Sequence, residues 1–385
     1  MRVSAALSLS IILGTACTEG GTDSAGWGGT IDTLENGAVL VSNPAEGIWT
    51  DQTAWWLVEE VRIGSVEGAG PETFAQIVDL EVDAAGRIYV LDRQTQDIRI
   101  FDQAGAHVRT IGRRGGGPGE FQLAHGLAMD HAGRLWVVDR NRFTLFDTSG
   151  TFLRTYRREV TLWEFRWSGG FLANGALYDL TMAGTTSGRT TALVRYDSIL
   201  GMVDTLLLPS YDRPVWEFSS ETGRMIMAVP FAPGISWTLD PRGYVWAGIT
   251  DQYRLHQITL TGDTIRIVQR EHTPVRVTPE ERDSLVETLQ ERVNAPIDVS
   301  KIPAQKPAFS QILVEESGHL WVTTSAPSGT PGTRFDVFDP EGRFLGSLST
   351  DLRISQLWIR GDKVYGVHRD ELDVPFVVRL RIGGR

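Results

Sequence analysis

Short runs of apolar residues, some continuous and some alternating with polar ones, recur along this chain in pairs joined by a turn. Such runs are typical of β-strands, and a glycine turn between two of them is typical of a hairpin. Six of these turns are each followed by an aromatic residue. The turn residues and their aromatic partners are Gly86 and Tyr89, Gly133 and Trp136, Gly175 and Tyr178, Gly243 and Trp246, Gly318 and Trp321, and Asp362 and Tyr365.

Six copies of one strand-turn-strand unit at regular spacing indicate a radial repeat. We therefore expect an all-β fold, a six-bladed β-propeller, with the recurring aromatic residues packed between the blades. A second series of turns, between the third and fourth strands of each blade, appears only five times. The chain ends at 379–385, where the last outer strand should follow, and the apolar run 55–63 is expected to supply that strand and close the ring.

One long insertion reads as a helix over 278–293. Thr278 suits the N-cap, Pro279 the first helical position, and Glu281 completes a capping box. Leu285, Val286, Leu289 and Val293 then form one apolar stripe. Because this insertion lies between two blades, the helix is expected either to cover the mouth of the central channel or to pack at the rim.

The N-terminus reads as an export signal. Arg2 precedes an apolar run at 5–13, and Cys17, the only cysteine, stands where a signal peptide would be cleaved. This resembles the bacterial lipobox, although Gly14 stands where an aliphatic residue is usual. We expect a lipoprotein-type signal at 1–17 with lipid attached to Cys17, or else an ordinary secretory cleavage. A tether with a possible extra strand would follow at 18–50, and the propeller at 51–385.

The composition of the chain limits the classes of partner that it is expected to bind. The 385 residues carry a net charge of −11, which disfavours binding to a nucleic-acid backbone. An exported, acidic chain with one cysteine is expected in the bacterial cell envelope, facing the periplasm or the outer surface, with the lipid as its membrane contact. Its partner would be an envelope protein, a polar small molecule or a glycan.

Propeller topology places the long loops on one face, which we call the top face. These loops join the second to the third strand within a blade, or one blade to the next, and they are where function usually lies. Counting seven residues back from each turn residue gives a set of small or polar residues expected to ring the channel mouth. They are Asp79, Gly126, Ser168, Ser236, Gln311 and Ser355. They either line a polar ligand site or bind channel water.

Two further groups point to the top face. Asp92 and Asp139 end the second strands of blades one and two, and we interpret them as structural, with Arg93 and Arg140 left for ligand or surface. Four aromatic residues in or near top-face segments are candidates for ligand contact: Trp163, Trp167, Trp216 and Phe218. The glycine-rich stretch 113–121 lacks the lysine and the following helix of a phosphate loop, so we interpret it as a tight crossing between blades.

Metal chemistry is the alternative. Three of the seven histidines, His125, His272 and His368, map to the top face, and three imidazoles with an open position can form a catalytic zinc site. They do not occupy equivalent repeat positions. A calcium site has Asp79 as its only carboxylate in the ring. The principal expectation is that no cofactor is bound, with Zn or Ca as the alternative.

The stretches 80–121 and 126–156 resemble NHL repeats, and the chain from residue 50 onward resembles the bacterial six-bladed β-propeller lipoproteins that carry NHL-like repeats. That resemblance implies a fold and an envelope location. NHL-like propellers bind proteins, glycans or RNA, and a few are metal-dependent lyases. We therefore expect a lipid-anchored scaffold that binds a partner or polar ligand without catalysis. The alternatives are a metal-dependent hydrolase or lyase of lactonase type, and a structural subunit of an envelope complex.

Overall fold

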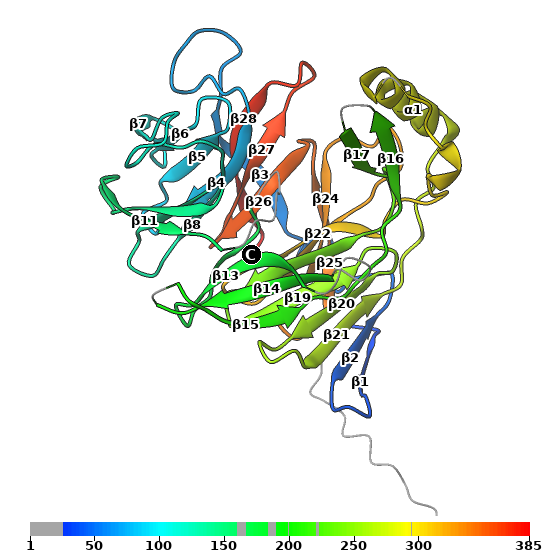
Figure 1. The fold of residues 1–385 in the computed structure, drawn as a ribbon. Coiled ribbons are helices and arrows are strands. Elements are labelled where there is room, and N and C mark those ends of the chain that lie inside the picture. The colour runs from blue at the N-terminus through cyan, green and yellow to red at the C-terminus, as the bar shows by residue number, and fades with distance from the viewer. Residues whose placement is uncertain (1–25, 160–166, 184–189, 199, 221–222, 294) are drawn as a thin grey trace, which may run out of the picture.

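A computed structural model describes residues 26–385, apart from 160–166, 184–189, 199, 221–222 and 294. The described chain forms a six-bladed β-propeller in which each blade is an antiparallel sheet (Figure 1). Blade one holds β4 (Ile77–Val82), β5 (Ile88–Asp92), β6 (Asp97–Phe101) and β7 (His107–Ile111). Blade two holds β8 (Ala124–Met129), β9 (Leu135–Asp139), β10 (Arg142–Phe146) and β11 (Phe152–Arg157).

Blades three and four follow the same order from the inner to the outer strand. Blade three holds β12 (Gly170–Phe171), β13 (Leu177–Ala183), β14 (Thr190–Tyr196) and β15 (Met202–Leu207). Blade four holds β18 (Ile235–Asp240), β19 (Tyr244–Ile249), β20 (Arg254–Ile258) and β21 (Thr264–Arg270). Two N-terminal strands, β1 (Thr30–Thr33) and β2 (Val39–Asn43), extend blade four, and β2 pairs in parallel with β21. The extra outer strand expected in 18–50 is therefore β2.

Blades five and six complete the ring. Blade five holds β22 (Phe309–Val314), β23 (Leu320–Thr324), β24 (Thr333–Phe338) and β25 (Phe344–Thr350). Blade six holds β26 (Ile354–Arg360), β27 (Lys363–Arg369), β28 (Pro375–Gly383) and, as its outer strand, β3 (Trp56–Ile63). The pairing of β3 with β28 confirms that the N-terminal strand closes the last blade. Inner strands β26 and β4 are in contact, so the last blade meets the first.

The recurring aromatic residues are core residues, as expected. All six are buried, with at most 6% of each side chain exposed. In four blades the polar atom of the aromatic ring bonds to an acid six residues earlier, at the start of the turn. These pairs are Tyr89 with Asp83, Trp136 with Asp130, Trp246 with Asp240, and Trp321 with Glu315. The repeated aromatic residue therefore fixes its own turn as well as filling the space between blades.

Two insertions on the top face pack together. The loop from blade three to blade four contains a hairpin of β16 (Val215–Ser220) and β17 (Gly223–Ala228). The loop from blade four to blade five contains α1 (Pro279–Val293) and the 3-10 turn η1 (Val299–Lys301). Trp216 and Leu289 are buried in one apolar cluster that joins the two insertions. We call β16, β17 and α1 the hairpin–helix unit.

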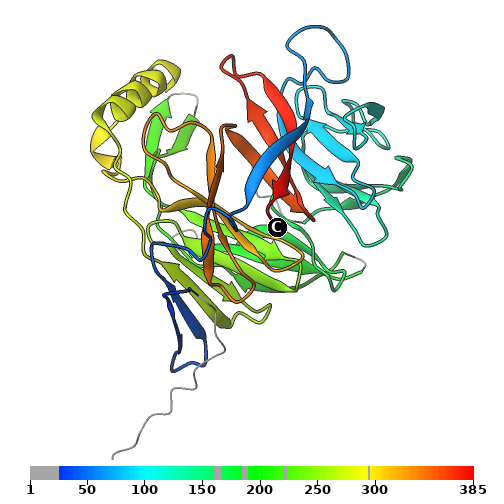
Figure 2. The same ribbon diagram turned by 180° about the vertical axis from the view of Figure 1, so that it is seen from behind.

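The capping box predicted for α1 is present, because the N–H of Glu281 donates to the Thr278 hydroxyl and the N–H of Thr278 donates to the Glu281 carboxylate. Both views place α1 at the edge of the molecule, on the outer side of the hairpin (Figures 1 and 2). That position favours packing at the rim over a cover for the channel. Lys306 pairs with Glu281 at 2.6 Å and donates to the carbonyl of Ala326, so the helix start is tied to a top-face loop of blade five.

None of the helices in the described part of the chain combines the length and apolarity needed to cross a bilayer.

Candidate functional site

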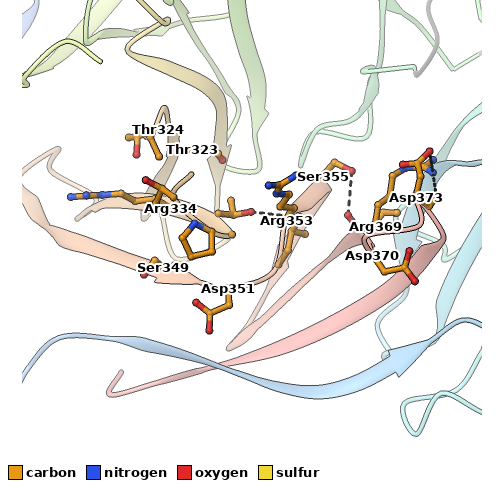
Figure 3. Close-up of a pocket in the computed structure, with 17 residues that line it drawn as sticks. Thr323, Thr324, Arg334, Ser349, Asp351, Arg353, Ser355, Arg369, Asp370 and Asp373 are labelled. Carbon is orange, nitrogen blue, oxygen red and sulfur yellow. Dashed lines mark hydrogen bonds and ion pairs between the residues drawn. The ribbon is translucent and has the colours of Figure 1, made fainter. Parts of the chain in front are cut away.

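A cavity of about 640 Å³ opens on the top face between blades five and six. It is built from the ends of β23 and β27, the loop 325–333, the crossing 351–353 and the loop 370–373. Figure 3 shows Arg353 and Ser355 near the middle of the lining residues, with Thr323 and Thr324 on one side and Arg369 on the other. The cavity therefore lies among the long loops that the sequence assigns to function.

The walls of the cavity are held by local hydrogen bonds. The Thr333 hydroxyl donates to the carbonyl of Leu352 at 2.8 Å and accepts from the N–H of Ile354 at 2.8 Å. These two bonds fix the crossing from blade five to blade six. On the opposite wall, the Asp370 carboxylate accepts from the N–H groups of Leu372 and Val374, both at 2.9 Å. The lining residues are therefore carried by loops with a defined geometry.

Some charged residues of the cavity lining are paired within the protein, and others are not. Arg369 is paired with Asp373 at 3.3 Å, and Asp370 is engaged in its own loop. Arg334 donates to the neutral hydroxyl of Ser347 at 3.2 Å. Within the described part of the chain, the guanidinium of Arg353 has no hydrogen bond or ion pair. The arginine in the middle of the cavity is thus available to a ligand.

Two hydroxyls at the cavity wall also lack partners. The side-chain oxygens of Thr323 and Thr324 are buried and make no hydrogen bond with any residue that the structure describes. Leaving a buried polar atom unsatisfied costs about 1–3 kcal/mol. Eleven such side-chain atoms occur among the described residues, and these two are the ones that line this cavity. A polar ligand in this cavity would provide both with a partner.

The ring of residues expected at the channel mouth is not a single site. Asp79 and Ser236 are buried, Gln311 is partly buried, and Ser168 is exposed just before β12. The Asp79 carboxylate accepts from the N–H of Leu127 at 2.8 Å, which braces the inner strand of blade one against that of blade two. Gly126 is buried in β8. Of these residues, Ser355 lines the cavity.

Asp92 and Asp139 brace the segments that lead into the inner strands. Asp92 accepts from the N–H groups of Ala75 and Gln76, and Asp139 from those of Gln122 and Leu123. Arg93 and Arg140, the residues that follow these acids, have interaction partners in the structure and do not line the cavity. Their counterpart in blade six, seven residues after its turn residue, is Arg369, which does line it.

The three top-face histidines lie in separate environments. His125 is buried in β8, with Nδ1 3.0 Å from the carbonyl of Leu123, and burial lowers its pKa. His272 lies 5.7 Å from the ring of Tyr253 in a second cavity, of about 510 Å³, beside β2. The Nδ1 of His368 lies 3.2 Å from the carbonyl of Arg353. Among the described residues, no three His, Cys, Asp or Glu side chains are grouped as metal ligands.

The aromatic residues expected to contact a ligand are mostly structural. Trp216 is 3% exposed because it forms the core of the hairpin–helix unit, and its Nε1 donates to the carbonyl of Asp298. Trp167 is 2% exposed and its Nε1 donates to Asp179 at 2.6 Å. Phe218 packs partly buried against the same core as Trp216. For Trp167 and Trp216 the expectation was therefore wrong, and Trp163 lies outside the described residues.

One buried acid that no pattern in the sequence singles out lies in the inner strand of blade one. Glu81 in β4 is buried, and burial raises its pKa to about 8, with the nearby Asp79 carboxylate acting in the same direction. Its Oε1 accepts from the N–H of Val82 at 2.9 Å. Glu81 is therefore largely protonated at neutral pH, and it belongs to the junction between blades one and two.

The cavity residues that the sequence did not reveal are Thr323, Thr324, Arg334 and Arg353. One signal could have identified Thr324. It lies six residues after its turn residue, as Asp92 and Asp139 do, and pairs with the first residue of its inner strand in the same way. A hydroxyl thus replaces a bracing carboxylate at this position of the repeat.

Comparisons with known proteins agree with the fold. A family model described as a 6-bladed beta-propeller matches residues 72–166. A protein described as exported, from Bacteroides fragilis, is 14% identical, with a TM-score of 0.50 over 89% of this chain and 99% of its own. A virginiamycin B lyase from Staphylococcus aureus, solved with quinupristin, is 11% identical, with a TM-score of 0.45 over 85% of this chain and 99% of its own. No curated protein matches in sequence. At these identities the likeness concerns the fold alone.

Proposed function

We propose that this protein is a lipid-anchored propeller of the bacterial cell envelope that binds a small polar ligand on its top face, without catalysis of its own. The single observation that carries the proposal is the cavity between blades five and six. Its volume of about 640 Å³ is in the range of small-molecule sites. It holds the guanidinium of Arg353 and two buried hydroxyls, and no described residue forms a hydrogen bond with any of these three groups. The envelope location and the anchor rest on the sequence around Cys17.

The binding proposal is tested by a screen of polar metabolites with the purified full-length protein, with ligand-induced change in melting temperature as the readout. A ligand that binds the folded state raises the melting temperature, and the rise grows with the logarithm of the ligand concentration relative to its dissociation constant. Ser355→Trp places a large side chain in the cavity and should abolish the shift. The matched control is Thr155→Trp, at an exposed position on the outer strand of blade two. Ligands that stabilise both variants equally would bind elsewhere and would refute the proposed site.

The anchor is tested separately. Metabolic labelling with a radioactive fatty acid should mark the wild-type protein, and Cys17→Ala should remove the label and release the protein from the membrane fraction. A labelled Cys17→Ala protein, or a wild-type protein without label, would contradict the lipid anchor while leaving the binding proposal intact.

A further inference from the structure

We infer that the ligand of the cavity carries a carboxylate group and that Arg353 is the residue that binds it. This inference rests on the proposed function, because it names the chemical class of ligand for that same site. It rests on the charged groups and hydrogen-bond donors of the cavity lining that are not paired with another described residue.

The side-chain groups that remain after internal pairing favour a ligand with hydrogen-bond acceptors. Arg369 and Asp373 pair with each other, and Asp370 accepts from two backbone N–H groups of its own loop. The charged lining residues not engaged in this way are Arg334 and Arg353 against the single carboxylate of Asp351. The lining as a whole holds three arginines and three aspartates, so this cavity is locally neutral in a chain with a net charge of −11.

The unpaired polar groups of the lining are hydrogen-bond donors, so they suit a ligand that carries acceptors. A guanidinium carries only donors, and its planar fork fits the two oxygens of a carboxylate. The hydroxyls of Thr323 and Thr324 supply two more donors at the wall, and the described residues leave both unpartnered. Figure 3 shows Arg353 in the middle of the group, whereas Arg334 extends away from the others. Arg353 is therefore the anchor, with the threonine hydroxyls as additional contacts.

The same lining limits how much negative charge the ligand can bring. Three aspartates, Asp351, Asp370 and Asp373, belong to the wall and would repel a dianion such as phosphate. None of the described residues that line the cavity is aromatic, so a nucleobase would find no ring on which to stack. A monocarboxylate that also bears hydroxyl groups satisfies both limits, because its hydroxyls can donate to the aspartates.

The test compares carboxylates with their neutral amides. Glucuronate, galacturonate and lactate are titrated into the full-length protein beside their primary amides, with inorganic phosphate as a further probe. We expect at least one carboxylate to bind about tenfold or more tightly than its amide. Arg353→Gln should remove this preference, and Arg353→Lys should retain part of it. Arg154→Gln, at an exposed position on the outer strand of blade two, is the matched control.

Several results would overturn the inference. The first is equal binding of the carboxylates and their amides, and the second is a carboxylate preference that survives in Arg353→Gln. Phosphate binding tighter than every carboxylate would overturn it as well. If neutral compounds bind and Ser355→Trp abolishes that binding, the proposed function stands and the carboxylate inference fails. If no probe binds the wild-type protein, the inference fails, and the proposed function fails only if the metabolite screen is also negative.

Discussion

Two crossings between neighbouring blades, both on the top face, show how one repeat can close tightly in one place and leave a cavity in another. Between blades one and two, the glycine-rich segment 113–121 is closed on itself, because Glu120 accepts from Arg113 and from the N–H of Gly117. The following residues are held by Asp139. Between blades five and six, the crossing leaves a cavity. The difference indicates that a blade gains a site where it gives up a bracing group.

The contrast can be traced to one position of the repeat, six residues after the turn residue, where blades one and two carry their bracing acids. Asp92, Asp139 and Thr324 each pair with the first residue of their inner strand. In blades one and two the acid accepts from backbone N–H groups, whereas the hydroxyl of Thr324 is one of the two unpartnered hydroxyls at the cavity. His368 at the corresponding position of blade six lies beside the carbonyl of Arg353. The same position therefore carries a structural acid in blades one and two, a cavity hydroxyl in blade five, and in blade six a histidine that contacts the backbone of Arg353.

The largest expected effect comes from removing the brace of the closed crossing. Asp139 is fully buried, accepts from two backbone N–H groups, and is paired with Arg142 at 2.6 Å. Asp139→Ala leaves these donors without a partner and should lower the free energy of unfolding by about 5 kcal/mol or more. Chemical denaturation of the variant and the wild type measures this loss of stability. A loss below about 1 kcal/mol would show that the carboxylate does not brace the crossing.

The next effect depends on pH and comes from the same junction of blades one and two. Because the pKa of Glu81 is raised from 4.5 to about 8, the folded state keeps a proton that the unfolded state releases. Glu81 should therefore reduce stability progressively as pH rises from about 4.5 to 8, by roughly 3–5 kcal/mol in the limit of high pH. Glu81→Gln should be more stable than the wild type at pH 8.5 and similar to it at pH 5.

Urea denaturation of both proteins at the two pH values isolates this contribution from other titrating groups. The exposed acid Glu35 provides the control, since Glu35→Gln should change stability little at either pH. A Glu81→Gln variant whose difference from the wild type is the same at pH 5 and pH 8.5 would contradict a raised pKa.

The smallest effect on stability is expected at the open crossing. Thr324→Val keeps the shape of the side chain and removes a hydroxyl that no described residue bonds. The free energy of unfolding should change by no more than about 0.5 kcal/mol, or rise slightly. Ligand binding at the cavity should nevertheless weaken. A loss of stability comparable to that of Asp139→Ala would mean that Thr324 is a brace after all.

The sequence was sufficient for the scaffold because the scaffold is what repeats. The six turn residues and their aromatic partners define six blades, and the missing outer strand leads directly to β3. The N-cap of α1 could also be predicted, because the capping hydrogen bonds join residues only three positions apart, Thr278 and Glu281. In each case, short-range chemistry or strict repetition carries the information.

The site could be predicted only in part, because it depends on contacts between segments distant in the sequence. Counting within the repeat found Ser355 but gave no reason to prefer it over Asp79, which braces two inner strands. From the sequence alone, Trp216 is a candidate for ligand contact, because its partner, α1, comes from a different insertion. Arg353 became recognisable only once the structure showed that Asp373 pairs with Arg369 instead.

The closure of blade six by β3 has a consequence for the order of events during biogenesis. A chain is synthesised from its N-terminus, so β3 is made before any of the blades is complete, yet its partner β28 is the last strand to be made. Until then β3 has no edge to join, and the ring cannot be completed. Joining segments so distant in the chain is entropically costly and slow. The ring must therefore stay open for a time, and a chain lacking 375–383 would remain open with two unpaired edges.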